Sequence, residues 1–180
     1  MLACFGDEGV EAARELVRIL VLGPLNVGLH VAGVIGHKTL LLVTDYRGGR
    51  YLSLSNVARY GLENRVIIWG TNASIPEAFN AFAAYTATGQ ISPFINEMAD
   101  IYAKSIEEDA TDVIVFGCGA LKWMKEVLEE QLDKRGYSIT VINPLPVAVR
   151  MAELLITMKL SHNLVGYPMP PAVSDRYGAK

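Results

Sequence analysis

Short apolar runs alternate with longer amphipathic segments along the chain. The short runs are apolar nearly throughout and rich in β-branched residues, which is typical of strands buried on both faces of a sheet. These predicted strands are Ile19–Leu22, Thr39–Thr44, Arg65–Trp69, Asp112–Gly117 and Ser138–Ile142. Because helices must cover both faces of such a sheet, the alternation predicts an α/β fold with a parallel sheet.

Segments with a helical period lie between these runs. Leu121–Arg135 is the clearest, because its apolar residues recur on one face and Gly136 follows it as a helix-ending residue. The other predicted helices are Val10–Val17, Leu25–Ile35, Asn96–Glu108 and Val147–Met158. The polar or broken stretches Asp45–Arg50 and Gly70–Pro93 are predicted loops, and the proline-rich tail Gly166–Lys180 is expected to be irregular.

The composition favours a folded body with a sizeable core. Of the 180 residues, 51% are hydrophobic and 19% are charged, below the charged fraction of about 25% that is usual in soluble domains. The net charge of -3, without any run of Lys or Arg, argues against a nucleic-acid partner. The uncharged stretch Ile19–His37 is interrupted by Pro24 and by glycines, so no membrane span is expected. Two cysteines without a secretory signal predict reduced thiols and a cytoplasmic location.

The two cysteines lie in segments of similar design. Cys4 follows the apolar stub Met1–Ala3, and Cys118 follows Val113–Phe116 and a glycine. We predict that each thiol lies at the carboxyl end of a strand, just before a helix, where open α/β sheets bind ligands and where free N–H groups stabilise a thiolate. Brought together, the two thiols could remove a proton from one face of a carbon and return one to the other. The alternative is that both simply pack as small hydrophobic residues.

Four segments resemble the hydantoin racemases of the Asp/Glu racemase superfamily. They are ACFGDEGVEAARELV, VIVFGCGAL, ITVINPLPVAVRMAELL and LSHNLVGYPMPP, and together they cover the chain nearly end to end. The resemblance implies two pseudo-symmetric, Rossmann-like lobes with parallel sheets and the active site between them. Residues 1–36 and 145–180 would form the first lobe, and residues 37–144 the second. Because family members carry strands and a Pro-Asn loop upstream of the first cysteine, we expect the first lobe to be incomplete.

The same resemblance implies a chemistry. It predicts a racemase, independent of PLP and of other cofactors, that inverts a carbon α to a carbonyl in 5-substituted hydantoins or related amino-acid derivatives. Cys4 and Cys118 would be the acid/base pair, and the substrate contacts would come from Phe5, Gly6, Thr44, Gly119 and Ala120. The partners expected are a small-molecule substrate and further copies of the chain in a homo-oligomer.

Some residues depart from the family pattern and keep alternatives open. Asp45 follows Thr44 where a second Thr is usual, and Asn143 stands where the family usually has Asp. The alternatives are an aspartate or glutamate racemase, a maleate cis–trans isomerase, or a truncated remnant without catalysis. The three histidines lack the spacing of metal ligands, so no metal site is expected. Asp7 and Glu8 are predicted to serve the start of the first helix, with a role toward substrate as the other possibility.

Overall fold

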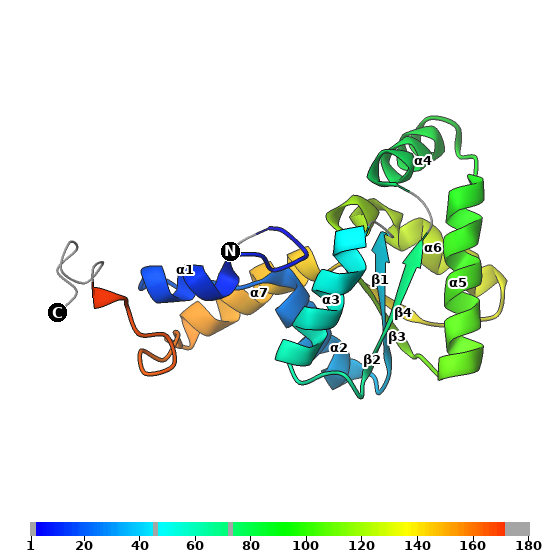
Figure 1. The fold of residues 1–180 in the computed structure, drawn as a ribbon. Helices are drawn as coiled ribbons and strands as arrows, with labels where there is room; N and C mark the ends of the chain where they lie inside the picture. The colour runs from blue at the N-terminus through cyan, green and yellow to red at the C-terminus, as the bar shows by residue number, and fades with distance from the viewer. Residues whose placement is uncertain (1–2, 45–46, 72–73, 172–180) are drawn as a thin grey trace.

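The computed structural model describes residues 3–44, 47–71 and 74–171 and contains one parallel sheet (Figure 1). Its strands are β1 (Thr39–Thr44), β2 (Val66–Thr71), β3 (Val113–Phe116) and β4 (Thr140–Ile142). They lie in the order β2-β1-β3-β4, and each neighbouring pair is parallel. The predicted α/β fold with a parallel sheet is therefore confirmed.

Helices connect the strands and cover both faces of the sheet. They are α1 (Val10–Leu16), α2 (Pro24–Ile35), α3 (Arg47–Arg59), α4 (Ile75–Thr88), α5 (Pro93–Asp109), the 3-10 helix η1 (Gly119–Met124), α6 (Lys125–Lys134) and α7 (Pro144–Thr157). In Figure 1, α2 and α3 lie on one face of the sheet, α5 and α6 on the other, and α4 near the carboxyl ends of the strands. Segment Leu121–Arg135, predicted as one helix, is thus split between η1 and α6.

The side chains of β1 show why this strand is apolar throughout. Leu40 and Leu42 belong to the core cluster beneath α5 and α6, whereas Leu41 and Val43 belong to the cluster beneath α2 and α3. Successive side chains of a strand point to opposite faces, and both faces of this sheet are covered. Every position of β1 is accordingly buried.

Helices α1 and α7 extend away from the sheet on the side of α2 (Figure 1). Helix α7 packs closely on α2, since a Cβ atom added to Gly28 would lie 2.6 Å from the Cβ of Pro144. All four strands fall within residues 37–144, the predicted second lobe. The described parts of residues 1–36 and 145–180 contain helices and irregular chain. The division into two lobes stays a prediction.

The predicted strand Ile19–Leu22 is wrong. None of its residues pairs with a strand, because side chains bind its main chain instead: Val21 donates its N–H to His162 Nε2 at 2.8 Å and accepts from Arg14 Nε at 3.1 Å. Leu22 packs in a small cluster with Ala148 of α7. The apolar character of this run reflects contact with a helix, which composition alone cannot distinguish from burial in a sheet.

Two of the predicted loops also contain helices. Helix α3 begins within Asp45–Arg50, of which residues 45 and 46 lie outside the described residues, and α4 occupies most of Gly70–Pro93. A sequence signal for α4 was present, because Ser74 and Glu77 form a capping box. The Ser74 N–H donates to Glu77 Oε2 at 2.6 Å, and the Glu77 N–H donates to Ser74 Oγ at 3.4 Å. The tail is irregular through Pro170 as predicted, and residues 172–180 lie outside the described residues.

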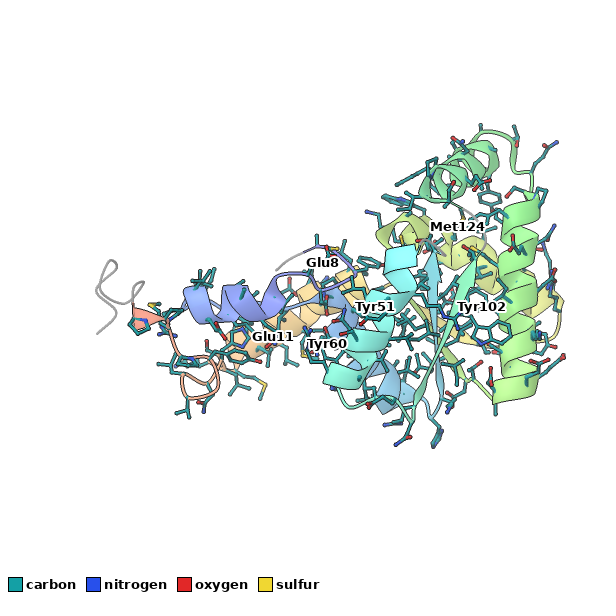
Figure 2. All side chains as sticks on the ribbon, in the orientation of Figure 1. Glu8, Glu11, Tyr51, Tyr60, Tyr102 and Met124 are labelled. Carbon is teal, nitrogen blue, oxygen red and sulfur yellow. The ribbon has the colours of Figure 1, made fainter. Side chains whose placement is uncertain are left out.

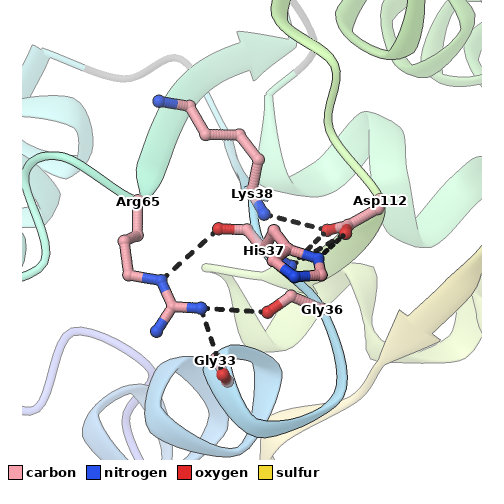
Figure 3. A network of polar contacts seen from close by, with 6 residues as sticks. All are labelled: Gly33, Gly36, His37, Lys38, Arg65 and Asp112. Carbon is pink, nitrogen blue, oxygen red and sulfur yellow. Dashed lines mark hydrogen bonds and ion pairs between the residues drawn. The ribbon is translucent and has the colours of Figure 1, made fainter.

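A network of polar contacts lies at the amino-terminal ends of the strands β1, β2 and β3 (Figure 3). The Asp112 carboxylate accepts the N–H groups of His37 at 2.8 Å and Lys38 at 2.9 Å. Arg65 donates to the carbonyls of Gly33 at 3.1 Å and Gly36 at 3.0 Å, which lie at the end of α2. Partial burial disfavours ionisation of Asp112, but the N–H groups of His37 and Lys38 outweigh it and hold its pKa below the ordinary 3.8.

Replacing Asp112 by asparagine should destabilise the fold at neutral pH, because it weakens the hydrogen bonds from the N–H groups of His37 and Lys38. The effect should be only about 1 kcal/mol, because the carboxylate is partly exposed to solvent. A lowered pKa in the folded state contributes stability above the unfolded value and loses it as the pH falls through the folded value. Urea unfolding should thus show the wild type and Asp112→Asn converging once the pH falls below 3.8. The exposed Asp133→Asn is the matched control, and a constant difference at every pH would contradict the prediction.

Candidate active site

A cavity of about 170 Å³ lies at the carboxyl ends of β1 and β3. It brings together residues that are far apart in the sequence. Six of the seven predicted site residues line it: Cys4, Phe5, Gly6, Thr44, Cys118 and Gly119. The seventh, Ala120, follows Gly119 in η1, where its side chain is buried, and it does not line the cavity. The two thiols therefore share one cavity of a size suited to a single small molecule.

The Cys118 side of the cavity is built on the sheet. Strand β3 ends at Phe116, and Gly117 then donates its N–H to Leu42 O at 2.7 Å. A Cβ atom at Gly117 would lie 2.7 Å from Val43 Cγ1 and 3.1 Å from Leu42 O, so only glycine fits here. Cys118 follows as the residue before η1, whose Leu121 donates to the Cys118 carbonyl at 3.0 Å. The predicted placement of Cys118, after a strand and before a helix, is thus confirmed, with a 3-10 helix in place of an α-helix.

We expect Gly117→Ala to lower the free energy of unfolding by about 1–3 kcal/mol, because the added methyl group overlaps the main chain and side chains of β1. Urea unfolding followed by circular dichroism measures this change. Gly119→Ala is the matched control, since a Cβ there would meet nothing closer than the Phe5 ring at 4.0 Å. Equal stability of the two variants would contradict the close contact at Gly117.

The Cys4 side is built on a loop, not on a strand and helix. Ala3 is not in a strand, Met1 and Leu2 lie outside the described residues, and α1 begins only at Val10. The strand predicted to end at Ala3 is thus not seen at that residue, whereas the helix predicted from Val10 begins there as expected. A turn bond from the Asp7 N–H to the Cys4 carbonyl at 3.2 Å closes the loop. Asn56 of α3 donates its Nδ2 to the Gly6 carbonyl at 2.6 Å and ties the loop to the body.

Asp7 anchors the same loop to α2. Its carboxylate accepts the N–H groups of Leu25 at 3.1 Å and Asn26 at 2.7 Å, which are among the unpaired donors at the start of α2. The Tyr60 hydroxyl of α3 donates to the same carboxylate at 2.8 Å. The Asp7 carboxylate thus serves the start of α2, whereas its main-chain carbonyl accepts the Val10 N–H at the start of α1 at 3.3 Å. This corrects the expectation that the charge of Asp7 serves α1. A side chain at Gly23 would overlap this carboxylate, so the cap requires a glycine there.

Glu8 and residues of α3 also line the cavity, beyond the predicted site residues. The Cys4 thiol lies 3.9 Å from Glu8 Oε2. Ser53, which is buried, and Leu52 come from α3. These two residues could not be placed from the sequence because α3 itself was not predicted. Thr44 is 2% exposed at the end of β1, and the adjacent Asp45 lies outside the described residues. Asn143 caps α7 by accepting the Leu145 N–H at 3.2 Å.

The described part of the chain shows neither a metal centre nor a membrane span. No three side chains of His, Cys, Asp or Glu gather there as a metal ion would need. Among the same residues, no helix combines the length and the apolar character needed to cross a bilayer. Two thiols, two hydroxyls and main-chain N–H groups around one small cavity define an α/β protein with a small-molecule site at the carboxyl end of its sheet.

The family of the protein follows from comparison with known sequences. The family model described as Asp/Glu/Hydantoin racemase matches residues 1–152. The chain therefore belongs to the Asp/Glu/hydantoin racemase family, as the two cysteine motifs predicted.

Two curated relatives are hydantoin racemases. The protein from Paenarthrobacter aurescens is 24% identical over 158 residues, which are 88% of this chain and 61% of the relative. The protein from Pseudomonas sp. is 25% identical over 171 residues, which are 94% of this chain and 63% of the relative. The chain thus spans less than two thirds of the length of either relative.

Two solved structures share the fold. The allantoin racemase from Klebsiella pneumoniae is 22% identical with a TM-score of 0.74, and the match covers 95% of this chain and 65% of that one. The allantoin racemase from Pseudomonas fluorescens is 21% identical with a TM-score of 0.78, covering 94% of this chain and 66% of that one. At this level of identity the likeness establishes the fold.

Proposed function

We propose that the protein is a cofactor-independent racemase that inverts the carbon α to a carbonyl in 5-substituted hydantoins or related amino-acid derivatives. Cys4 and Cys118 are its acid/base pair. One observation carries the proposal: Cys4 and Cys118, which are far apart in the sequence, line a single cavity of about 170 Å³. The names of the relatives support the substrate class, since hydantoin and allantoin share the same five-membered ring.

The reaction needs one proton transfer on each face of the carbon. The thiolate of one cysteine removes the α-proton, and the electron pair of the C–H bond moves into the adjacent carbonyl to give an enolate. The thiol of the other cysteine then protonates the opposite face and is left as the thiolate. No electron is gained or lost, and the two cysteines exchange protonation states in each turnover.

The enolate oxygen needs hydrogen-bond donors that are not already in use. Within the described residues, the main-chain N–H groups of Phe5, Gly6 and Gly119 donate to no other group, and all three residues line the cavity. The Thr44 hydroxyl lines it as well. Donors held in place before the reaction stabilise developing negative charge without a cost of reorganisation. We assign these groups to the substrate's oxygens; the contact predicted for Ala120, which does not line the cavity, stays a prediction.

Racemisation in deuterated water tests the proposal directly. Optically pure L- and D-5-alkylhydantoins are incubated with the protein and without added cofactor, and polarimetry follows the loss of rotation. Both enantiomers should racemise faster than in a blank without protein, and NMR should show one solvent deuterium at the α-carbon of each inverted molecule. Loss of rotation no faster than in the blank would refute the proposal.

A further inference from the structure

Glu8 gives the candidate active site a carboxylate in addition to its two thiols. Among the described residues that line the cavity, it is the one with a formally charged side chain. The other lining side chains are thiols, the hydroxyls of Thr44 and Ser53, and apolar groups such as Leu52 and Ile75. Figure 2 labels Glu8 in the loop ahead of α1, the same loop that carries Cys4. A charge at this position attracts or repels the charged groups of any ligand that is bound beside the two thiols.

No cationic side chain that the structure places, a set that leaves out residues 45–48, forms an ion pair with this carboxylate. The arginine on the same segment, Arg14, pairs with Glu11 at 2.7 Å and also donates to the Tyr167 hydroxyl at 3.0 Å. The contact of Glu8 with the site is to the Cys4 thiol, 3.9 Å from Oε2. Glu8 therefore faces the cavity as a carboxylate whose one printed contact is the hydrogen bond that it accepts from a reacting thiol.

We propose that Glu8 selects the substrate by charge: the site accepts hydantoins whose 5-substituent is neutral or cationic and rejects those that carry a carboxylate. This inference rests on the proposed racemase function. A substituent that leaves the cavity past Cys4 meets the Glu8 carboxylate within a few ångströms. At such a distance a unit charge near a protein surface changes affinity by about tenfold or more in either direction. The specificity thus depends on a residue that transfers no proton in the reaction.

Three hydantoins of similar size test the proposal. Their 5-substituents are aminobutyl, butyl and carboxyethyl, which are cationic, neutral and anionic at neutral pH. The wild type should prefer aminobutyl over carboxyethyl in kcat/KM, and Glu8→Gln should reduce that ratio about tenfold. Glu8→Lys should invert the order. Because the effect is electrostatic, added salt should shrink the ratio for the wild type more than the ratio for Glu8→Gln, in which the thiolate is the remaining anion of the site.

Controls separate this proposal from the proposed function. Glu15→Gln removes the same charge from an exposed position on α1 outside the cavity and should leave all three ratios unchanged. Failure to racemise butylhydantoin would refute the proposed function alone. Titration calorimetry of the same three compounds then measures charge selection without turnover. Equal affinities for the cationic and anionic compounds, or absence of binding by all three, would overturn the role of Glu8.

Discussion

If the proposed function is correct, replacing either Cys4 or Cys118 by serine should lower the rate of hydantoin racemisation by about 10²–10⁴-fold, the usual contribution of a positioned acid or base. A serine hydroxyl occupies nearly the same space but gives up a proton far less readily than a thiol. Both residues line the same cavity, and inversion needs proton transfer on both faces of the carbon. The variants Cys4→Ser and Cys118→Ser should therefore be about equally impaired.

Isotope exchange distinguishes a two-base mechanism from a general loss of activity. Each single variant keeps one thiol, which can still remove the α-proton from the enantiomer that presents it and return solvent deuterium to the same face. We expect exchange without inversion, and the enantiomer that exchanges should switch between Cys4→Ser and Cys118→Ser. NMR and polarimetry on the same sample measure both quantities, with thermal melts to verify the fold. A variant that racemises at the wild-type rate would eliminate its cysteine from the mechanism.

Replacing Asp7 by alanine should cost about 2–4 kcal/mol of unfolding free energy, the largest stability effect that we expect from a polar residue. Asp7 as a whole residue is 4% exposed, and its carboxylate accepts hydrogen bonds from Leu25, Asn26 and Tyr60. Removing the acceptor leaves these three donors without a partner in a region that water reaches poorly. Tyr60→Phe deletes one of the three bonds and should cost about 1 kcal/mol.

The effect of Asp7 should also depend on pH, in the direction opposite to that of Asp112. Burial raises the pKa of the Asp7 carboxyl above the ordinary 3.8, although the bonds from Asn26, Tyr60 and Leu25 oppose the rise. With the higher pKa in the folded state, the stabilising contribution is complete below pH 3.8 and declines as the pH rises through the folded value. The difference in free energy of unfolding between the wild type and Asp7→Ala, measured in urea, should therefore be smaller at neutral pH than below pH 3.8. A difference that grows with pH would contradict this assignment, and Glu15→Ala is the surface control.

A strand that is covered on both faces of the sheet could be predicted closely from its local sequence pattern. β1 has the predicted bounds Thr39–Thr44, because both its faces are covered and every residue is apolar or β-branched. The segment Ile19–Leu22 has the same composition but contacts α7 and the side chains of Arg14 and His162. Local pattern records that a residue is buried and not which partner buries it. The same limit hid α3, whose residues show no clear apolar stripe.

The two cysteine segments of the candidate site could be predicted from the sequence, but the hydrogen bonds that hold these segments in place could not. The Cys4 and Cys118 segments could be singled out because each places a cysteine among glycines after an apolar run. The bonds that hold them, from Asn56 to Gly6 and from the start of α2 to Asp7, join positions far apart in the sequence. Such contacts depend on how the helices pack in three dimensions, so no spacing rule along the chain reveals them.

The two thiols are anchored unequally. Cys118 extends directly from a buried central strand, whereas Cys4 is kept in place by a few hydrogen bonds from α2 and α3. A mild rise in temperature or denaturant that breaks those bonds would move one sulfur away from the other while the sheet persists. Catalytic inactivation should accordingly precede the loss of far-ultraviolet ellipticity, and a ligand that spans both sulfurs should bring the two transitions together.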